Sequence, residues 1–252
     1  MIEPYFYGNK FELGSFPPWP CPICGRHSLA IKPGSLNQEE TSESQRAHSH
    51  EDWDPEWVSE RFVCLLVCQD FRCGEPCTVA GSTSYDLEPG PDFDTTEYLE
   101  PHFVEPAPEL IKIPGKCPKD VATNLRAAFS LFWNDPSAAL NRIRISLEAL
   151  LDSEKVQKKA KTKKGKFQQL SLHHRIEKFL PKDVSTRTKL LAVKWLGNEG
   201  SHQGSITKVE VLEALELVEN ILEIVVVKRP QYLDRMAREI AKRKGKPQKP
   251  PF

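Results

Sequence analysis

The residues best suited to chemistry are six cysteines between positions 21 and 77, which form two groups. The first, CPICG, carries Cys21 and Cys24, and two thiolates at this spacing in a tight turn can bind one tetrahedral zinc ion. The second group leaves several pairings open among Cys64, Cys68, Cys73 and Cys77. We favour Cys68 with Cys73, because CQDFRCG also ends in Cys-Gly and lies between two predicted strands.

The predicted metal site is therefore a structural zinc site with four cysteine ligands: Cys21, Cys24, Cys68 and Cys73. Four protein ligands close the coordination sphere, so such an ion stabilises a small module and does not catalyse. The alternative is that these are ordinary buried thiols. His27 is close enough to replace one cysteine, whereas Cys117, isolated beside a proline, is not expected to be a ligand.

A second candidate site is the segment KWLGNEGSHQG, residues 194–204. Gly197 can end a helix in the left-handed conformation, and Asn198 tolerates the turn that follows. His202 would then fix the loop before the next helix by a hydrogen bond to a backbone carbonyl. The residues alone therefore favour a helix corner, with Trp195 in the core.

Seven lysines lie between Lys155 and Lys166. Such a run is either a solvated loop between helices or a surface that contacts phosphates and releases their counterions. The basic tail KRKGKPQKPPF could extend that surface. The candidate nucleic-acid-binding residues are Lys158, Lys159, Lys161, Lys163, Lys164, Lys166 and Lys194.

Charge divides the 252-residue chain into two parts, although the formal net charge is zero. Residues 1–117 carry 8 Lys/Arg against 20 Asp/Glu, a net charge of −12, and residues 118–252 carry +12. This asymmetry indicates two modules, of which the second can attract phosphate or an acidic partner. The N-terminus lacks the pattern of a signal peptide, and no apolar run approaches the length of a membrane span. We expect a cytoplasmic protein with reduced cysteines.

The strands and helices that the sequence predicts around these residues are those of an α+β protein. Residues 1–88 are expected to form a small β-rich, zinc-ribbon-like module, with an acidic flexible insertion near 34–55. Its strand candidates are Arg61–Cys68 and Cys77–Tyr85. Residues 89–117 are rich in proline and predict an extended connector. Residues 118–252 predict a helical bundle with a basic C-terminal tail.

Helical periodicity is strongest after Asp135, a good N-cap followed by Pro136 at the first helical position. Thr207 and Glu210 form a capping box before another helix. A terminal helix is expected within PQYLDRMAREIAKRKGK. The helix that begins at this capping box is predicted to cover Thr207–Val227, and the remaining predicted helices cover Asp120–Trp133, Leu170–Leu180 and Ser185–Leu196.

Three segments together resemble a known bacterial family: GKCPKDVATNLRAAFSLFWNDPSAALNRIRISLEALL, LHHRIEKFLP and VKWLGNEGSH. That family is a domain of unknown function found in type I restriction subunits and in stand-alone proteins behind an N-terminal zinc ribbon. CPICG, CQDFRCG and VAG suit the ribbon, so the resemblance covers most of the chain. It implies an all-α domain similar to the HEPN superfamily, whose members commonly form homodimers.

Active members of the HEPN superfamily are metal-independent ribonucleases with an Arg-polar-x3-His motif, commonly Arg-Asn-x3-His. The resemblance places Asn198 and His202 at the polar and histidine positions as catalytic candidates, with histidine for proton transfer. Gly197 stands where the family carries arginine, and the cation would have to come from Lys194, Arg142 or Arg144.

Three functions are therefore expected as alternatives. The first is a non-catalytic accessory protein that binds RNA or DNA in anti-phage defence or a toxin system. The second is a HEPN-type endoribonuclease that uses His202. The third is a homodimeric interaction scaffold, in which the acidic half of one protomer meets the basic half of another.

Overall fold

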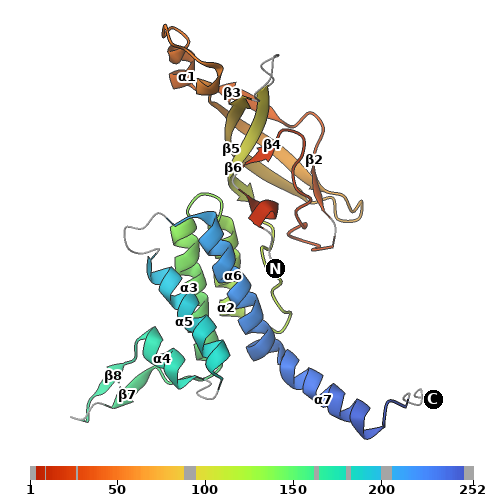
Figure 1. Ribbon diagram of the computed structural model, residues 1–252, viewed down its shortest axis with the longest axis vertical. Helices are drawn as coiled ribbons and strands as arrows, with labels where there is room; N and C mark the ends of the chain where they lie inside the picture. Colours follow the sequence, from red (N-terminus) through yellow and green to blue (C-terminus); the bar gives the residue numbers. More distant parts are fainter. Residues whose placement is uncertain are drawn as a thin grey trace.

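The computed structural model is an α+β structure in which a β-rich domain precedes a helical domain (Figure 1). This order confirms the predicted fold class. The residues that the structure describes are 4–8, 10–26, 28–87, 95–161, 165–179, 183–199 and 206–246.

One six-stranded antiparallel sheet forms the β domain, in the order β1-β6-β5-β4-β2, with β3 also paired to β4. In β4, four buried residues alternate with more exposed ones, as expected where one face of a strand packs on a core. Both predicted strands are present, in β4 and β5. The strands are β1 (Phe11–Glu12), β2 (Leu29–Ile31), β3 (Asn37–Glu40), β4 (Glu60–Cys68), β5 (Pro76–Leu87) and β6 (Thr95–Glu105).

The acidic segment near 34–55 is not an unstructured insertion. Its first part is β3, which pairs with the N-terminal half of β4, and its second part is helix α1 (Ser42–Ala47). The side chain of Thr41 caps α1 by accepting a hydrogen bond from the backbone N–H of Ser44. Because backbone pairing along a sheet edge does not require apolar side chains, the polar composition of this segment did not reveal its structure.

The proline-rich segment 89–117 is also more than a connector, because its residues 95–105 form β6 in the interior of the sheet. Proline lacks the N–H that a sheet ladder uses, so it is expected at edges and bulges. Pro101 pairs with Gly81 where the register of β5 and β6 shifts. The bulge therefore accommodates the proline, and the β domain extends to Glu105.

The helical domain is a bundle of α2, α3, α5 and α6, with the short α4 packed against α3 and α5. Asp135 caps α3 by accepting a hydrogen bond from the N–H of Ala138 (2.8 Å), and the capping box of Thr207 and Glu210 begins α6. These caps confirm two predicted helix starts. The helices are α2 (Lys119–Leu131), α3 (Pro136–Ser153), α4 (Leu172–Lys178), α5 (Val184–Glu199), α6 (Lys208–Leu222) and α7 (Arg229–Lys242).

Two elements extend from the bundle (Figure 1). One is a hairpin between α3 and α4, formed by β7 (Lys159–Lys161) and β8 (Phe167–Gln169). The other is α7, which continues from α6 through the π-helical turn η3 (Glu223–Val227). Among the helices of the described residues, none is both long and apolar enough to cross a membrane.

An aromatic cluster joins the two domains. Tyr7 and Trp19 come from the β domain, and Phe132 and Trp133 follow α2. The rings of Trp19 and Trp133 have centroids 4.7 Å apart, and Tyr7 packs edge-on against Phe132 and Trp133. All four side chains are at most 5% exposed. The β domain and the bundle therefore share a continuous hydrophobic core.

Candidate functional site

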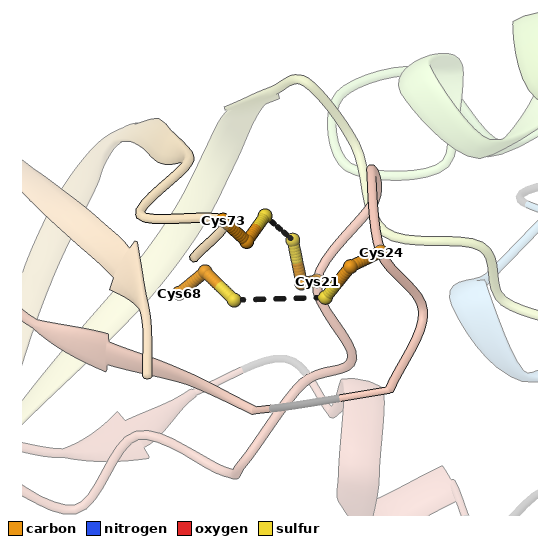
Figure 2. A group of neighbouring side chains, drawn as sticks. All are labelled: Cys21, Cys24, Cys68 and Cys73. Carbon is orange, nitrogen blue, oxygen red and sulfur yellow. Dashed lines mark hydrogen bonds between the residues drawn. The ribbon is translucent and has the colours of Figure 1, made fainter. Parts of the chain in front are cut away.

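Two cysteine-bearing turns face each other at one end of the sheet (Figure 2). The first turn lies between Trp19 and β2, and the second joins β4 to β5. Each ends in a glycine with a positive φ, +61° at Gly25 and +57° at Gly74. Glycine adopts this conformation without steric cost, so the two Cys-Gly pairs of the sequence correspond to two similar turns.

The turns bring together the four cysteines that the sequence singled out (Figure 2). The Sγ atoms of Cys21 and Cys73 are 3.7 Å apart, as are those of Cys24 and Cys68, and all four lie within 4.8 Å of one another. Tetrahedral zinc with Zn–S bonds of about 2.3 Å requires sulfur atoms about 3.8 Å apart. The cluster therefore has the dimensions of a four-thiolate zinc site.

The surroundings of the sulfurs favour a closed, structural site. Cys21 and Cys68 are buried, and burial raises the pKa of the Cys68 thiol to about 12. A metal binds thiolates, so zinc would have to displace protons here. The backbone N–H of Asp70 donates to the Sγ of Cys68 (3.5 Å) and would stabilise the thiolate. With four protein ligands, the ion would link the two turns and have no open position for a substrate.

The remaining cysteines lie outside the cluster. Cys64 and Cys77 are buried in β4 and β5, and burial raises their thiol pKa values to about 11 and about 12. The Sγ of Cys77 donates to the backbone oxygen of Pro106 (3.1 Å). Cys117 is half-buried. His27, the alternative ligand, lies outside the described residues.

The second candidate site differs from the predicted helix corner. Gly197 does not end a helix, because α5 continues to Glu199. A Cβ atom at Gly197 would lie 2.8 Å from the Cβ of Arg144 and 3.3 Å from the backbone oxygen of Leu140. Glycine is thus required by the close approach of α5 to α3. The sequence suggested a glycine cap because contacts between helices leave no local pattern.

Of the two catalytic candidates, Asn198 is half-buried near the end of α5, and His202 lies outside the described residues. Arg144 extends beside Gly197 and pairs with Glu148 (3.2 Å). Burial lowers the pKa of Lys194, and the nearby charge of Arg144 lowers it further. Of the three cations named as replacements for the missing arginine, Lys194 and Arg144 therefore lie close to Gly197.

Trp195 is not a core residue. Its side chain is 58% exposed, and the Nζ of Lys194 lies 3.2 Å from the centroid of its ring. Lys194 itself is only 9% exposed, unlike the lysines of the run. It therefore belongs to the α3–α5 contact and not to an open basic surface.

The lysine run is a hairpin in part, and not only a loop. Lys159 and Lys161 are paired with Gln169 and Phe167 respectively, and paired residues of a hairpin point to the same face. Lys166 is exposed beside β8, whereas Lys158 is held by an ion pair with Asp152 (2.7 Å). Lys163 and Lys164 lie outside the described residues.

Phe167 was missed as a candidate. It is 68% exposed, and the Nζ of Lys161 lies 5.7 Å from its ring centroid. The available signal was Gly165 between the short segments KAK and FQQ, since a glycine-containing turn between two short segments is typical of a hairpin. The surface formed by Lys159, Lys161, Phe167 and Gln169 is called the hairpin face below.

Comparison with known proteins gives two family matches. Residues 9–103 match a family described as "Domain of unknown function (DUF8608)", and residues 126–243 match one described as "Domain of unknown function (DUF4145)". No curated protein and no solved structure matches the chain significantly. The first match covers the cysteine cluster and most of the sheet, and the second covers most of the helical region. The two parts of the chain are thus each similar to a different family of unknown function.

Proposed function

We propose that the protein is a non-catalytic accessory protein that binds single-stranded nucleic acid through its hairpin face. The observation that carries this proposal is an exposed aromatic ring on the same hairpin face as two exposed lysines, with Phe167 opposite Lys161 and Lys159 in the next pair on that face. The resemblance to a HEPN-like family supports a place in anti-phage defence or a toxin system. Zinc at the cysteine cluster would stabilise the β domain.

Each part of the hairpin face has a physical role in this proposal. Lysines neutralise phosphates and release condensed counterions, which gives affinity without sequence preference. An exposed ring offers a platform on which an unpaired base can stack. A base pair within a duplex has no exposed π-face, so the aromatic residue favours a single strand. The net charge of +12 on residues 118–252 adds a long-range attraction for phosphate.

Changing Lys159 and Lys161 to glutamine is expected to weaken binding of a labelled single strand and to lower its salt dependence. Loss of two phosphate contacts reduces the slope of log Kd against log salt concentration by about 1.4. Phe167→Ala is expected to weaken binding by about 1–3 kcal/mol with the slope unchanged, because stacking involves no counterion release. Fluorescence anisotropy over a salt series, with single-stranded RNA, single-stranded DNA and duplex DNA, measures these effects.

The matched control replaces two exposed lysines of another region, Lys116 and Lys119, with glutamine. This change removes the same charge and leaves the hairpin face intact. Equal weakening by the control would show a response to net charge alone and would refute a specific role for the hairpin. Tighter binding of the duplex than of either single strand would equally refute the proposal.

A second candidate function is RNA cleavage, and the position of Arg144 favours it. A Cβ atom at residue 197 would lie 2.8 Å from the Cβ and 3.3 Å from the Cδ of Arg144. Arg144 on α3 therefore brings a guanidinium close to position 197 of α5, where the family carries its arginine. In this alternative, His202 transfers the proton and Asn198 is the polar member of the motif.

His202→Ala is expected to lower the rate of RNA cleavage about 100-fold or more if histidine transfers a proton. Arg144→Ala should lower the rate as well, whereas Arg142→Ala, an exposed arginine on the same helix, should not. Gel analysis of labelled RNA with added chelator measures the three rates. Cleavage that survives His202→Ala unchanged would exclude this function.

A further inference from the structure

Helix α7 presents an apolar face that nothing in the described structure covers. None of its residues is buried, and it leaves the bundle (Figure 1). The apolar side chains recur at helical spacing, so they form one stripe. An amphipathic helix normally buries such a stripe against a core. The stripe consists of Tyr232 (52% exposed), Leu233 (41%), Met236 (38%) and Ile240 (40%).

A groove between α5 and α6 has the complementary character. Its volume is about 960 Å³, and its apolar floor includes Ala192, Leu196 and Leu217. Trp195 lies on its α5 side, and 58% of this large apolar side chain is exposed. Two carboxylates, Glu213 and Glu216, line the α6 side. Lys189 lines the α5 side, where its Nζ donates to the Oδ1 of Asn220 (2.7 Å). The groove therefore offers an apolar surface with two carboxylates and one ammonium group at its edge.

The stripe and the groove agree in length and in charge. From Tyr232 to Ile240 the stripe is about 12 Å long, and the groove residues Glu213 to Asn220 extend over about 10.5 Å of α6, at 1.5 Å per residue. Arg235 and Arg243 line the same hollow of α7 as Tyr232, Met236 and Ile240, together with the carboxylate of Glu239. The two arginines would face the carboxylates of the groove when the stripe enters it.

The direction in which α7 leaves the bundle indicates which helix can fill the α5–α6 groove. Lys228, in the left-handed conformation, connects η3 to α7, and α7 then continues away from α5 and the rest of the bundle (Figure 1). A second copy of the chain carries both an identical helix and an identical groove. We propose that the protein forms a two-fold symmetric dimer in which α7 of each copy lies in the α5–α6 groove of the other. Two reciprocal contacts close the assembly at two copies.

Two charge-reversal variants of the full chain test this arrangement. The arm variant carries Arg235→Glu and Arg243→Glu, and the groove variant carries Glu213→Lys and Glu216→Lys. In sedimentation velocity, the unchanged protein is expected to be a dimer. Each variant is expected to be monomeric, with its dimer dissociation constant raised about 100-fold or more, because like charges then meet in both contacts.

Equimolar mixing of the two variants is the decisive step. The acidic arm of one variant then fits the basic groove of the other, and the basic arm fits the acidic groove, so a dimer with one copy of each is expected. A control reverses Arg238, which lies on the face of α7 opposite Met236 and Ile240. This control is expected to remain dimeric. Circular dichroism of every variant verifies that the helices are retained.

Three results would overturn the proposal. An unchanged protein that is monomeric at every concentration has no such dimer. Variants that remain dimeric, or that fail to form a mixed dimer, exclude this pairing of helix and groove. Sedimentation of a monomeric protein with phosphatidylserine vesicles, lost on Leu233→Asp with Met236→Asp, would assign the stripe to a lipid surface instead.

Discussion

Replacing Cys21 and Cys24 with serine is expected to abolish zinc binding and to unfold the β domain. The four Sγ atoms come from the turn before β2 and the turn between β4 and β5, which are far apart in sequence, so a bound ion would link the two turns. Structural zinc contributes about 10–16 kcal/mol of binding free energy to the folded state. A domain is stable by only about 5–15 kcal/mol, so loss of the ion removes most or all of this stability.

Metal analysis of the purified protein and its circular dichroism measure this effect. The matched control is Cys117→Ser, because this cysteine is half-buried and lies outside the cluster. It is expected to retain one zinc ion per chain and the signal of the β domain. Undiminished zinc in the double variant would contradict the ligand set, and a metal-free protein with the unchanged sequence would show that the cluster consists of ordinary thiols.

Trp133→Ala is expected to lower the free energy of unfolding by about 3–5 kcal/mol, as for other large aromatic residues removed from a core. Trp133 is 1% exposed and packs on Trp19, Tyr7 and Phe132. Its indole nitrogen has no hydrogen-bond partner among the described residues, so the expected loss is one of packing. Because the ring lies where the two domains meet, the β domain and the bundle of the Trp133→Ala variant should unfold in separate transitions.

Urea denaturation followed by circular dichroism and by tryptophan fluorescence detects both effects. The unchanged protein is expected to give coincident transitions, since the two domains share one core. Trp57→Ala removes a tryptophan that is 46% exposed and should change the stability by at most about 0.5 kcal/mol. Equal losses from the two substitutions would contradict a structural role for the aromatic cluster.

The aromatic cluster also connects the cysteine cluster to the helical domain. Trp19 lies two residues before Cys21, and its ring contacts Trp133. Displacement of the first cysteine turn would therefore disturb the ring that supports α2. Zinc bound at one end of the sheet would thus stabilise the surface on which the bundle rests.

Local patterns in the sequence were sufficient for several elements. The two Cys-Gly turns predicted the four clustered cysteines, and the strand candidates Arg61–Cys68 and Cys77–Tyr85 correspond to β4 and β5. Asp135 before Pro136, and Thr207 with Glu210, predicted two helix starts. In each case, the determining interactions join residues close together in the chain, so residue type and spacing carry the information.

Tertiary structure decided the features that depend on distant partners. β3 and β6 are strands because β4 and β5 offer them backbone hydrogen bonds, although acidic and proline-rich composition indicated otherwise. Gly197 is required by α3 and not by a helix end, and Trp195 faces a groove between α5 and α6. Packing between helices and pairing between strands involve residues that spacing along the chain does not relate. The sequence by itself therefore determined which cysteines cluster and where two helices start, whereas only the assembled fold decided which helix faces were covered and which remained exposed.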